Sequence, residues 1–149
     1  MNVFVDTNIL IYRRDPRDPT KQKLAYDWIA ALGGGRTGRL SWQVLQEFFV
    51  NAIRKLENVG LTAELARSDV RLLSQWSPPA TDLALIELAW RMQDRHQFSW
   101  WDALIVAAAL RQECSMLISE DMQHGLVIDN RLTLINPFAP DAPLPSAAS

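Results

Sequence analysis

Short apolar runs alternate along the chain with longer stretches in which apolar residues recur every three or four positions. The short runs are rich in strand-forming residues and too short for helices, so they predict buried strands of a parallel sheet. We expect such strands at Val3–Val5, Met116–Ile118 and Leu132–Ile135, and a further short strand at Arg39–Ser41.

The longer stretches predict helices, because residues that favour helix ends bound them. Asp18 and Pro19 begin one helix, which the triple glycine 33–35 is expected to end. The full set is Ile9–Tyr12, Pro19–Leu32, Trp42–Leu56, a helix from Thr62 to the two prolines at 78–79, one from Thr81 to His96, and one from Ser99 to Leu110. In the helix after Thr62, we expect Leu65, Leu72, Leu73 and Trp76 in the core.

Strands separated by helices predict an α/β fold, a three-layer domain with a central, mainly parallel sheet flanked by helices. The apolar run Ala103–Leu110 has no polar face, so its helix is expected to be buried on every side. We expect the domain to span residues 1–138. Residues 139–149, rich in Pro, Ala and Ser, are expected to form a disordered tail.

Composition narrows the class of protein. The 149 residues suffice for one domain with an apolar core. The single Cys114 cannot form an intrachain disulfide, and no Cys/His cluster has the spacing of a zinc site. No apolar run is long enough for a membrane span, and the first residues do not resemble a signal peptide. We therefore expect a cytoplasmic protein with no membrane association.

The charge of the chain excludes one kind of nucleic-acid-binding protein. A net charge of −2 argues against binding through bulk positive charge, which needs clustered Lys and Arg. It is compatible with a nuclease whose acidic site binds cations. Five basic residues near the first turn could track a phosphate backbone or form a solvated face: Arg13, Arg14, Arg17, Lys21 and Lys23.

Four acidic residues are candidates for a metal site. Asp6 and Asp121 follow predicted parallel strands, so both point to the carboxyl edge of the sheet, where ligands of such sheets bind. Glu47 lies on the third long helix, and Asp102 lies at the start of the buried helix. Carboxylates brought together need a proton or a cation between them, and such oxygen ligands suit Mg²⁺ or Mn²⁺.

Each candidate also has a purely structural interpretation. Asn8 favours a helix-capping role, and Ser99-x-x-Asp102 is a capping-box pattern in which Asp102 would satisfy the helix amino terminus. Asp121 could be a turn residue. Glu47 lies opposite the apolar face of its helix, where most glutamates are solvated. It qualifies as a site residue only if that face lines a groove.

In order along the chain, four short motifs resemble those of PIN-domain ribonucleases, in particular VapC-type toxins of bacterial toxin–antitoxin pairs. They are Val-Asp-Thr-Asn at 5–8, Gln-Glu-Phe at 46–48, Ser-Trp-Trp-Asp-Ala at 99–103 and Ser-Glu-Asp-Met-Gln-His-Gly at 119–125. The resemblance covers almost the whole chain and implies a PIN-like domain. The metal-binding and catalytic acids it implies are Asp6, Glu47, Asp102 and Asp121, with Thr7, Ser119 and Asn8 as supporting residues.

The activity implied by the resemblance is hydrolysis of RNA phosphodiester bonds that depends on Mg²⁺ or Mn²⁺. The implied partners are an RNA substrate, a cognate antitoxin protein and a second copy of the chain. Glu120 ranks below its neighbour Asp121 as a ligand, and His124 is expected to be a loop residue. Two alternatives stay open: a non-catalytic PIN-fold binding module, and an RNA-processing nuclease without an antitoxin.

Overall fold

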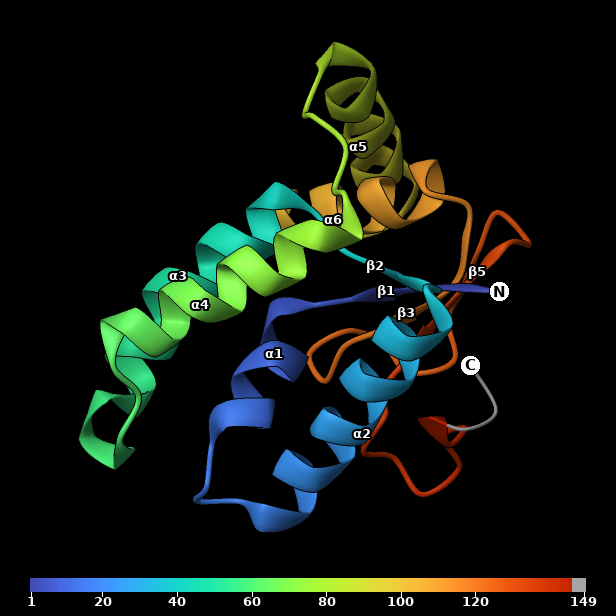
Figure 1. The fold of residues 1–149 in the computed structure, drawn as a ribbon. Helices are drawn as coiled ribbons and strands as arrows, with labels where there is room; N and C mark the ends of the chain where they lie inside the picture. Colours follow the sequence, from blue (N-terminus) through green and yellow to red (C-terminus); the bar gives the residue numbers. More distant parts are fainter. Residues whose placement is uncertain (146–149) are drawn as a thin grey trace.

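The computed structural model describes residues 1–145, and its centre is a five-stranded sheet (Figure 1). The strand order is β2-β1-β3-β5-β4. The bounds are β1 Asn2–Val5, β2 Gly38–Arg39, β3 Cys114–Ile118, β4 Val127–Ile128 and β5 Leu132–Ile135. The pairs of β1 with β2, β1 with β3 and β3 with β5 are parallel, and only β4 pairs with β5 in the antiparallel direction.

Six α-helices and two short 3₁₀ helices surround the sheet. The α-helices are α1 Thr7–Arg14, α2 Pro19–Gly35, α3 Trp42–Leu56, α4 Ala63–Leu73, α5 Leu83–Arg95 and α6 Trp100–Arg111, and the 3₁₀ helices are η1 Glu57–Val59 and η2 Ser74–Trp76. Figure 1 shows α1 and α2 on one side of the sheet and α5 and α6 on the other, with α3 and α4 beside the end of β1. The predicted three-layer α/β fold with a mainly parallel sheet is therefore confirmed.

The core forms where the apolar pattern predicts it. Val3, Phe4 and Val5 of β1 are fully buried, and so is most of α6 from Ala103 to Leu110. No helix in residues 1–145 is long and apolar enough to cross a membrane.

The helix predicted to stop at the triple glycine continues through it. α2 includes Gly33 and Gly34 and ends at Gly35. Its C-cap Arg36 adopts the left-handed conformation with φ 56° and donates its N–H to the carbonyls of Leu32 and Gly33. Glycine lowers helix propensity by about 1 kcal/mol but does not forbid a helix, so the run only weakens the last turn. The helix therefore ends at the last of the three glycines, three residues beyond the predicted Leu32.

Two of the predicted core leucines of α4 are exposed. Leu65 is 43% and Leu72 is 54% exposed, whereas the buried face of α4 consists of Ala66, Asp69 and Leu73. Asp69 is buried because it receives hydrogen bonds from the Arg14 guanidinium. Because the charged Asp69 lies on the buried face, the apolar pattern of α4 predicted the wrong face as the buried one.

Smaller differences concern the ends of elements. Asp82 caps α5 by accepting a hydrogen bond from the Leu85 N–H, so the helix does not begin at the predicted Thr81. The β2 strand begins before the predicted Arg39–Ser41 segment, and the two-residue β4 was not predicted. Of the predicted tail, residues 146–149 lie outside the described residues. The division of the chain at residue 138 stays a prediction.

Candidate functional site

Asp6 lies where β1 ends and α1 begins, and it is the most buried of the predicted acids. Its side chain is 8% exposed and caps α1 by accepting a hydrogen bond from the Thr7 N–H at 2.7 Å. The other carboxylate oxygen accepts the Ser119 hydroxyl at 2.7 Å. Asp6 therefore both caps α1 and lies at the carboxyl edge of the sheet.

The end of β3 approaches Asp6 through Asn8 and Ser119. The Asn8 amide donates to Ser119 Oγ at 3.1 Å and to Asp121 Oδ2 at 3.1 Å, and its own oxygen accepts the Glu120 N–H. Ser119 Oγ also accepts the Asp121 N–H. The helix-capping role predicted for Asn8 was wrong, because Asp6 is the N-cap of α1 and Asn8 lies within the helix. Asn8 instead connects the ends of the two central strands and holds Asp121 near Asp6.

Glu47 points toward this same edge of the sheet. The Thr7 hydroxyl donates to Glu47 Oε2 at 3.0 Å, and the Gln43 amide donates to Glu47 Oε1 at 3.0 Å. The side chain is half-buried. The solvated face that the helical wheel suggests therefore lines the site. Gln43 is a site residue that the sequence reasoning missed, although its position one turn before Glu47 on the same helix was an available signal.

Asp102 lies in the first turn of α6, and Ser99 caps this helix. Ser99 Oγ accepts the Asp102 N–H at 3.2 Å, and no backbone N–H in residues 1–145 donates to the Asp102 carboxylate. Burial raises the pKa of Asp102, the Ser99 hydroxyl lowers it, and the charges of Asp121 and Glu47 raise it again. The Asp102 carboxylate therefore accepts no hydrogen bond from a backbone N–H of residues 1–145, and it is repelled by the charges of two other acids.

The electrostatic environment of Asp6 opposes its negative charge. Burial raises the pKa of Asp6 to about 6, although the hydrogen bonds from Ser119 and Thr7 lower it. The charges of Asp102 and Glu47 raise it further. Asp6 and Asp102 each experience the charges of two other acids at this edge of the sheet, so a proton or a cation there would stabilise them.

The donor set fits a hard divalent cation in its chemistry. It consists of carboxylate, hydroxyl and amide oxygens, the ligands that Mg²⁺ and Mn²⁺ prefer. In their present positions, however, no three His, Cys, Asp or Glu side chains of residues 1–145 are gathered closely enough to hold an ion. Ligation by several of these acids therefore requires side-chain rotation toward a common centre.

Glu120 faces away from the acids. It accepts hydrogen bonds from the Tyr12 hydroxyl and the Lys21 ammonium group, between α1 and α2. Its neighbour Asp121 takes the opposite direction toward Asn8. The two residues thus leave β3 toward different partners, as expected for adjacent positions at the end of a strand.

His124 takes part in the packing of the segment after β5. Its Nδ1 accepts the Asn136 N–H at 2.9 Å, and its Nε2 lies 3.0 Å from an Asp141 carboxylate oxygen. These contacts give it a structural part in the loop.

The basic residues near the first turn are engaged within the domain. Each lies in a salt bridge with a carboxylate: Arg13 and Arg14 with Asp69, Arg17 with Asp15, Lys21 with Glu120, and Lys23 with Asp27. This pairing argues against a phosphate-tracking surface. Only Arg17 and Lys23 lie on a solvated face, because Arg13 and Arg14 are largely covered beside the buried Asp69.

Two recesses adjoin the acids. One, of about 480 Å³, includes Glu47, Gln43 and Trp101 in its lining, and the other, of about 420 Å³, includes Asp102 and Asp121. Three of the four acids therefore line recesses open to a ligand, and Asp6 lines neither recess.

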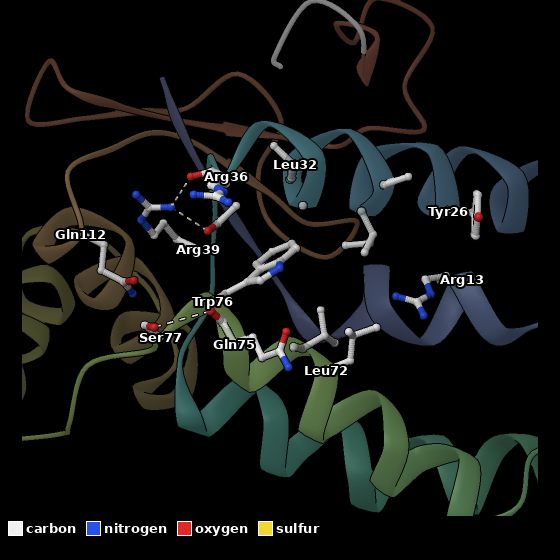
Figure 2. Close-up of a pocket in the computed structure, with 15 residues that line it drawn as sticks. Arg13, Tyr26, Leu32, Arg36, Arg39, Leu72, Gln75, Trp76, Ser77 and Gln112 are labelled. Carbon is white, nitrogen blue, oxygen red and sulfur yellow. Dashed lines mark hydrogen bonds between the residues drawn. The ribbon is translucent and has the colours of Figure 1, made fainter.

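A larger pocket of about 900 Å³ lies elsewhere, between α2, β2 and η2 (Figure 2). Figure 2 shows the Trp76 ring extending into this space, with Arg36 and Arg39 toward one end and Arg13 toward the other. None of the predicted site residues lines it. The volume of a pocket therefore does not identify the candidate site in this chain, because the four acids lie outside the larger pocket.

Comparison with known proteins gives one result. A family model described as PIN domain matches residues 3–125, most of the chain and all four of the predicted acids. No curated protein matches the sequence.

Proposed function

Because the chain belongs to the PIN domain family, whose members are generally metal-dependent nucleases, we propose that it is an endoribonuclease dependent on Mg²⁺ or Mn²⁺. We further propose that it is the toxin of a toxin–antitoxin pair and acts on RNA in the cytoplasm. The observation that carries the nuclease proposal is the gathering of Asp6, Glu47, Asp102 and Asp121 at one edge of the sheet. The charges of Asp102 and Glu47 oppose that of Asp6, and the charges of Asp121 and Glu47 oppose that of Asp102, so the arrangement costs stability in the absence of a cation.

In the proposed site, Asp6, Asp102 and Asp121 would hold the cation, with Glu47 as the fourth acid. A bound divalent cation would lower the pKa of an attacking water and offset charge that develops on the phosphate. Thr7 and Gln43 hold both oxygens of Glu47, so this carboxylate is oriented before substrate binds. Its proposed role is to orient the attacking water. Ser119 fixes one oxygen of Asp6. Because the attacking group would be a water, no Ser or Cys nucleophile is needed.

The decisive test is RNA cleavage across a titration of Mg²⁺ and Mn²⁺. We expect the wild type to cleave, and we expect Asp6→Asn and Asp102→Asn each to abolish cleavage without loss of the fold. Glu120→Gln is the matched control, because its carboxylate faces Tyr12 and Lys21 instead of the acids. A folded wild type that binds RNA but cleaves none at any metal concentration would identify a non-catalytic binding module instead.

The proposed inhibitor is an antitoxin that places an Arg or Lys among the four acids. A guanidinium satisfies carboxylates in pairs and relieves their repulsion without supplying a reactive water. Inhibition should therefore weaken as Mg²⁺ or Mn²⁺ rises. Equal binding to an Asp6→Asn/Asp102→Asn double variant would place the inhibitor on a remote surface. A neighbouring reading frame for a small DNA-binding protein would favour the toxin over an RNA-processing nuclease without an antitoxin.

We also propose that the protein forms a homodimer through α3 and α4. These helices carry large apolar side chains that the domain does not bury, including Trp42, Val50, Leu65 and Leu72. An apolar recess between the two helices, lined in part by Trp42, Phe49, Val50 and Val70, adds to this surface. Surplus apolar surface of this kind is typical of an interface.

A further inference from the structure

The recess beside Glu47 is lined by both apolar and polar side chains. Leu85, Leu104 and Ala108 contribute apolar surface, while Gln43, Gln46 and Trp101 contribute polar and aromatic groups. We call it the Trp101 recess. Its volume of about 480 Å³ lies within the range of small-ligand sites, so it can receive a planar ring of nucleobase size.

Trp101 connects the recess to the acids. The residue directly precedes Asp102, and its side chain is 61% exposed, although indole rings are usually well covered. The Gln43 amide donates to the Trp101 carbonyl at 3.3 Å and to Glu47 at 3.0 Å, so one side chain holds both residues. The Trp101 backbone is thus held beside Glu47, and its exposed aromatic ring offers a surface on which a base could stack.

The negative charge of the Trp101 recess favours the uncharged base of a nucleotide over its phosphate. No Lys or Arg lines it, and Glu47 is its only ionisable side chain, so a phosphate group would be repelled there. In residues 1–145 no group donates to the amide oxygens of Gln43 or Gln46, while their amide nitrogens already donate to Glu47, Trp101 and Trp42. These oxygens could therefore accept N–H groups on the edge of a base.

The larger pocket of Figure 2 has the opposite character. Arg36 and Arg39 form no salt bridge in the described part of the chain, and Arg13 shares Asp69 with Arg14, so the pocket carries excess positive charge. Binding there would depend strongly on salt, whereas binding of an uncharged ring in the Trp101 recess would not. This difference separates the two sites by experiment.

We propose that the Trp101 recess binds a nucleobase of the RNA strand beside the bond that is cut. Trp101 would stack on the base and position the strand, and Gln46 would contribute to a preference among bases. This inference rests on the proposed function, because the base is taken to belong to the RNA substrate. Binding of the base itself does not require hydrolysis.

The first experiment measures binding in EDTA, where a metal-dependent nuclease does not cleave. Fluorescence anisotropy with labelled RNA hexanucleotides that differ at one position gives affinities, and saturation-transfer NMR with free nucleosides tests the base alone at low and high salt. We expect Trp101→Ala to weaken hexanucleotide binding by about 5- to 100-fold and to abolish the nucleoside signal, while Trp101→Phe retains both. The nucleoside signal should not depend on salt.

The control is Trp90→Ala, which removes an indole that is 50% exposed on α5 and lines neither the Trp101 recess nor the larger pocket. It should bind like the wild type. The same result for Trp101→Ala would overturn the proposal. The proposal would also be overturned if Trp101→Ala changed the oligomeric state in sedimentation but left RNA binding unchanged. The recess would then be a contact between copies of the chain.

The second experiment measures cleavage with metal present. We expect Trp101→Ala to raise KM with little change in kcat, and Gln46→Ala to change the base preference next to the cut. Loss of nucleoside binding in Trp101→Ala, together with a wild type that never cleaves, would retain the base site and refute the nuclease. Normal cleavage by Trp101→Ala, with unchanged KM and base preference, would retain the nuclease and refute the base site.

Discussion

Replacement of Asp6 by Asn should change the pH dependence of stability in a way that follows from burial. The pKa of Asp6 rises from an ordinary 3.8 to about 6 in the folded protein, chiefly because the side chain is buried. Folding therefore favours the protonated form. The stabilisation by this proton is complete below the unfolded pKa and is lost as the pH rises through about 6.

The magnitude follows from the shift of about two pKa units. At about 1.4 kcal/mol per unit, ionised Asp6 costs the folded state about 3 kcal/mol, of which about 2 kcal/mol should develop between pH 4.5 and pH 8. The neutral asparagine side chain of the Asp6→Asn variant can keep the hydrogen bond from the Thr7 N–H without this cost. In EDTA, Asp6→Asn should therefore be close to the wild type at pH 4.5 and more stable than it at pH 8.

The assay is urea unfolding of both proteins at several pH values. The difference between them isolates Asp6, because the other carboxylates are common to both. Asp94→Asn, a change of an exposed acid on α5, should follow the wild type at every pH. Addition of Mg²⁺ or Mn²⁺ at pH 8 should stabilise the wild type more than Asp6→Asn. A difference in unfolding free energy that stays constant from pH 4.5 to 8 would refute the reasoning.

Three further predictions concern the cap, the sheet edge and the dimer. Ser99→Ala should lower the free energy of unfolding by about 1 kcal/mol, whereas Asp102→Asn without metal should leave it unchanged or raise it; the reverse order in urea unfolding would make Asp102 the cap. Gly38→Ala should cost about 1–3 kcal/mol in the same assay, because the added Cβ would overlap the Trp76 ring, and an unchanged midpoint would show that the ring can move. Val50→Glu should convert a dimer to a monomer in sedimentation at tens of micromolar, and a monomeric wild type would exclude the proposed dimer.

The sequence by itself determined the elements whose signals are local. The buried strand that ends at Asp6 and the all-apolar run from Ala103 to Leu110 were recognisable from residue patterns alone, as was α3 with its ends at Trp42 and Leu56. Parallel strands end at one edge of a sheet, so the order of strands and helices along the chain suffices to assign Asp6 and Asp121 to the same edge. The apolar pattern is a property of a short segment, and helices between successive strands imply that the strands are parallel. Both can therefore be read from the sequence.

Only the tertiary structure decided what depends on contacts between distant segments. Asp69 is buried because arginines of α1 reach it, and this made Leu65 and Leu72 exposed against their apolar character. Glu47 belongs to the acidic edge because Thr7, forty positions away, donates to it. The Trp101 recess exists because α3, α5 and α6 meet beside that edge. These features arise from free energies of pairing and packing between elements, which no local pattern of residues contains.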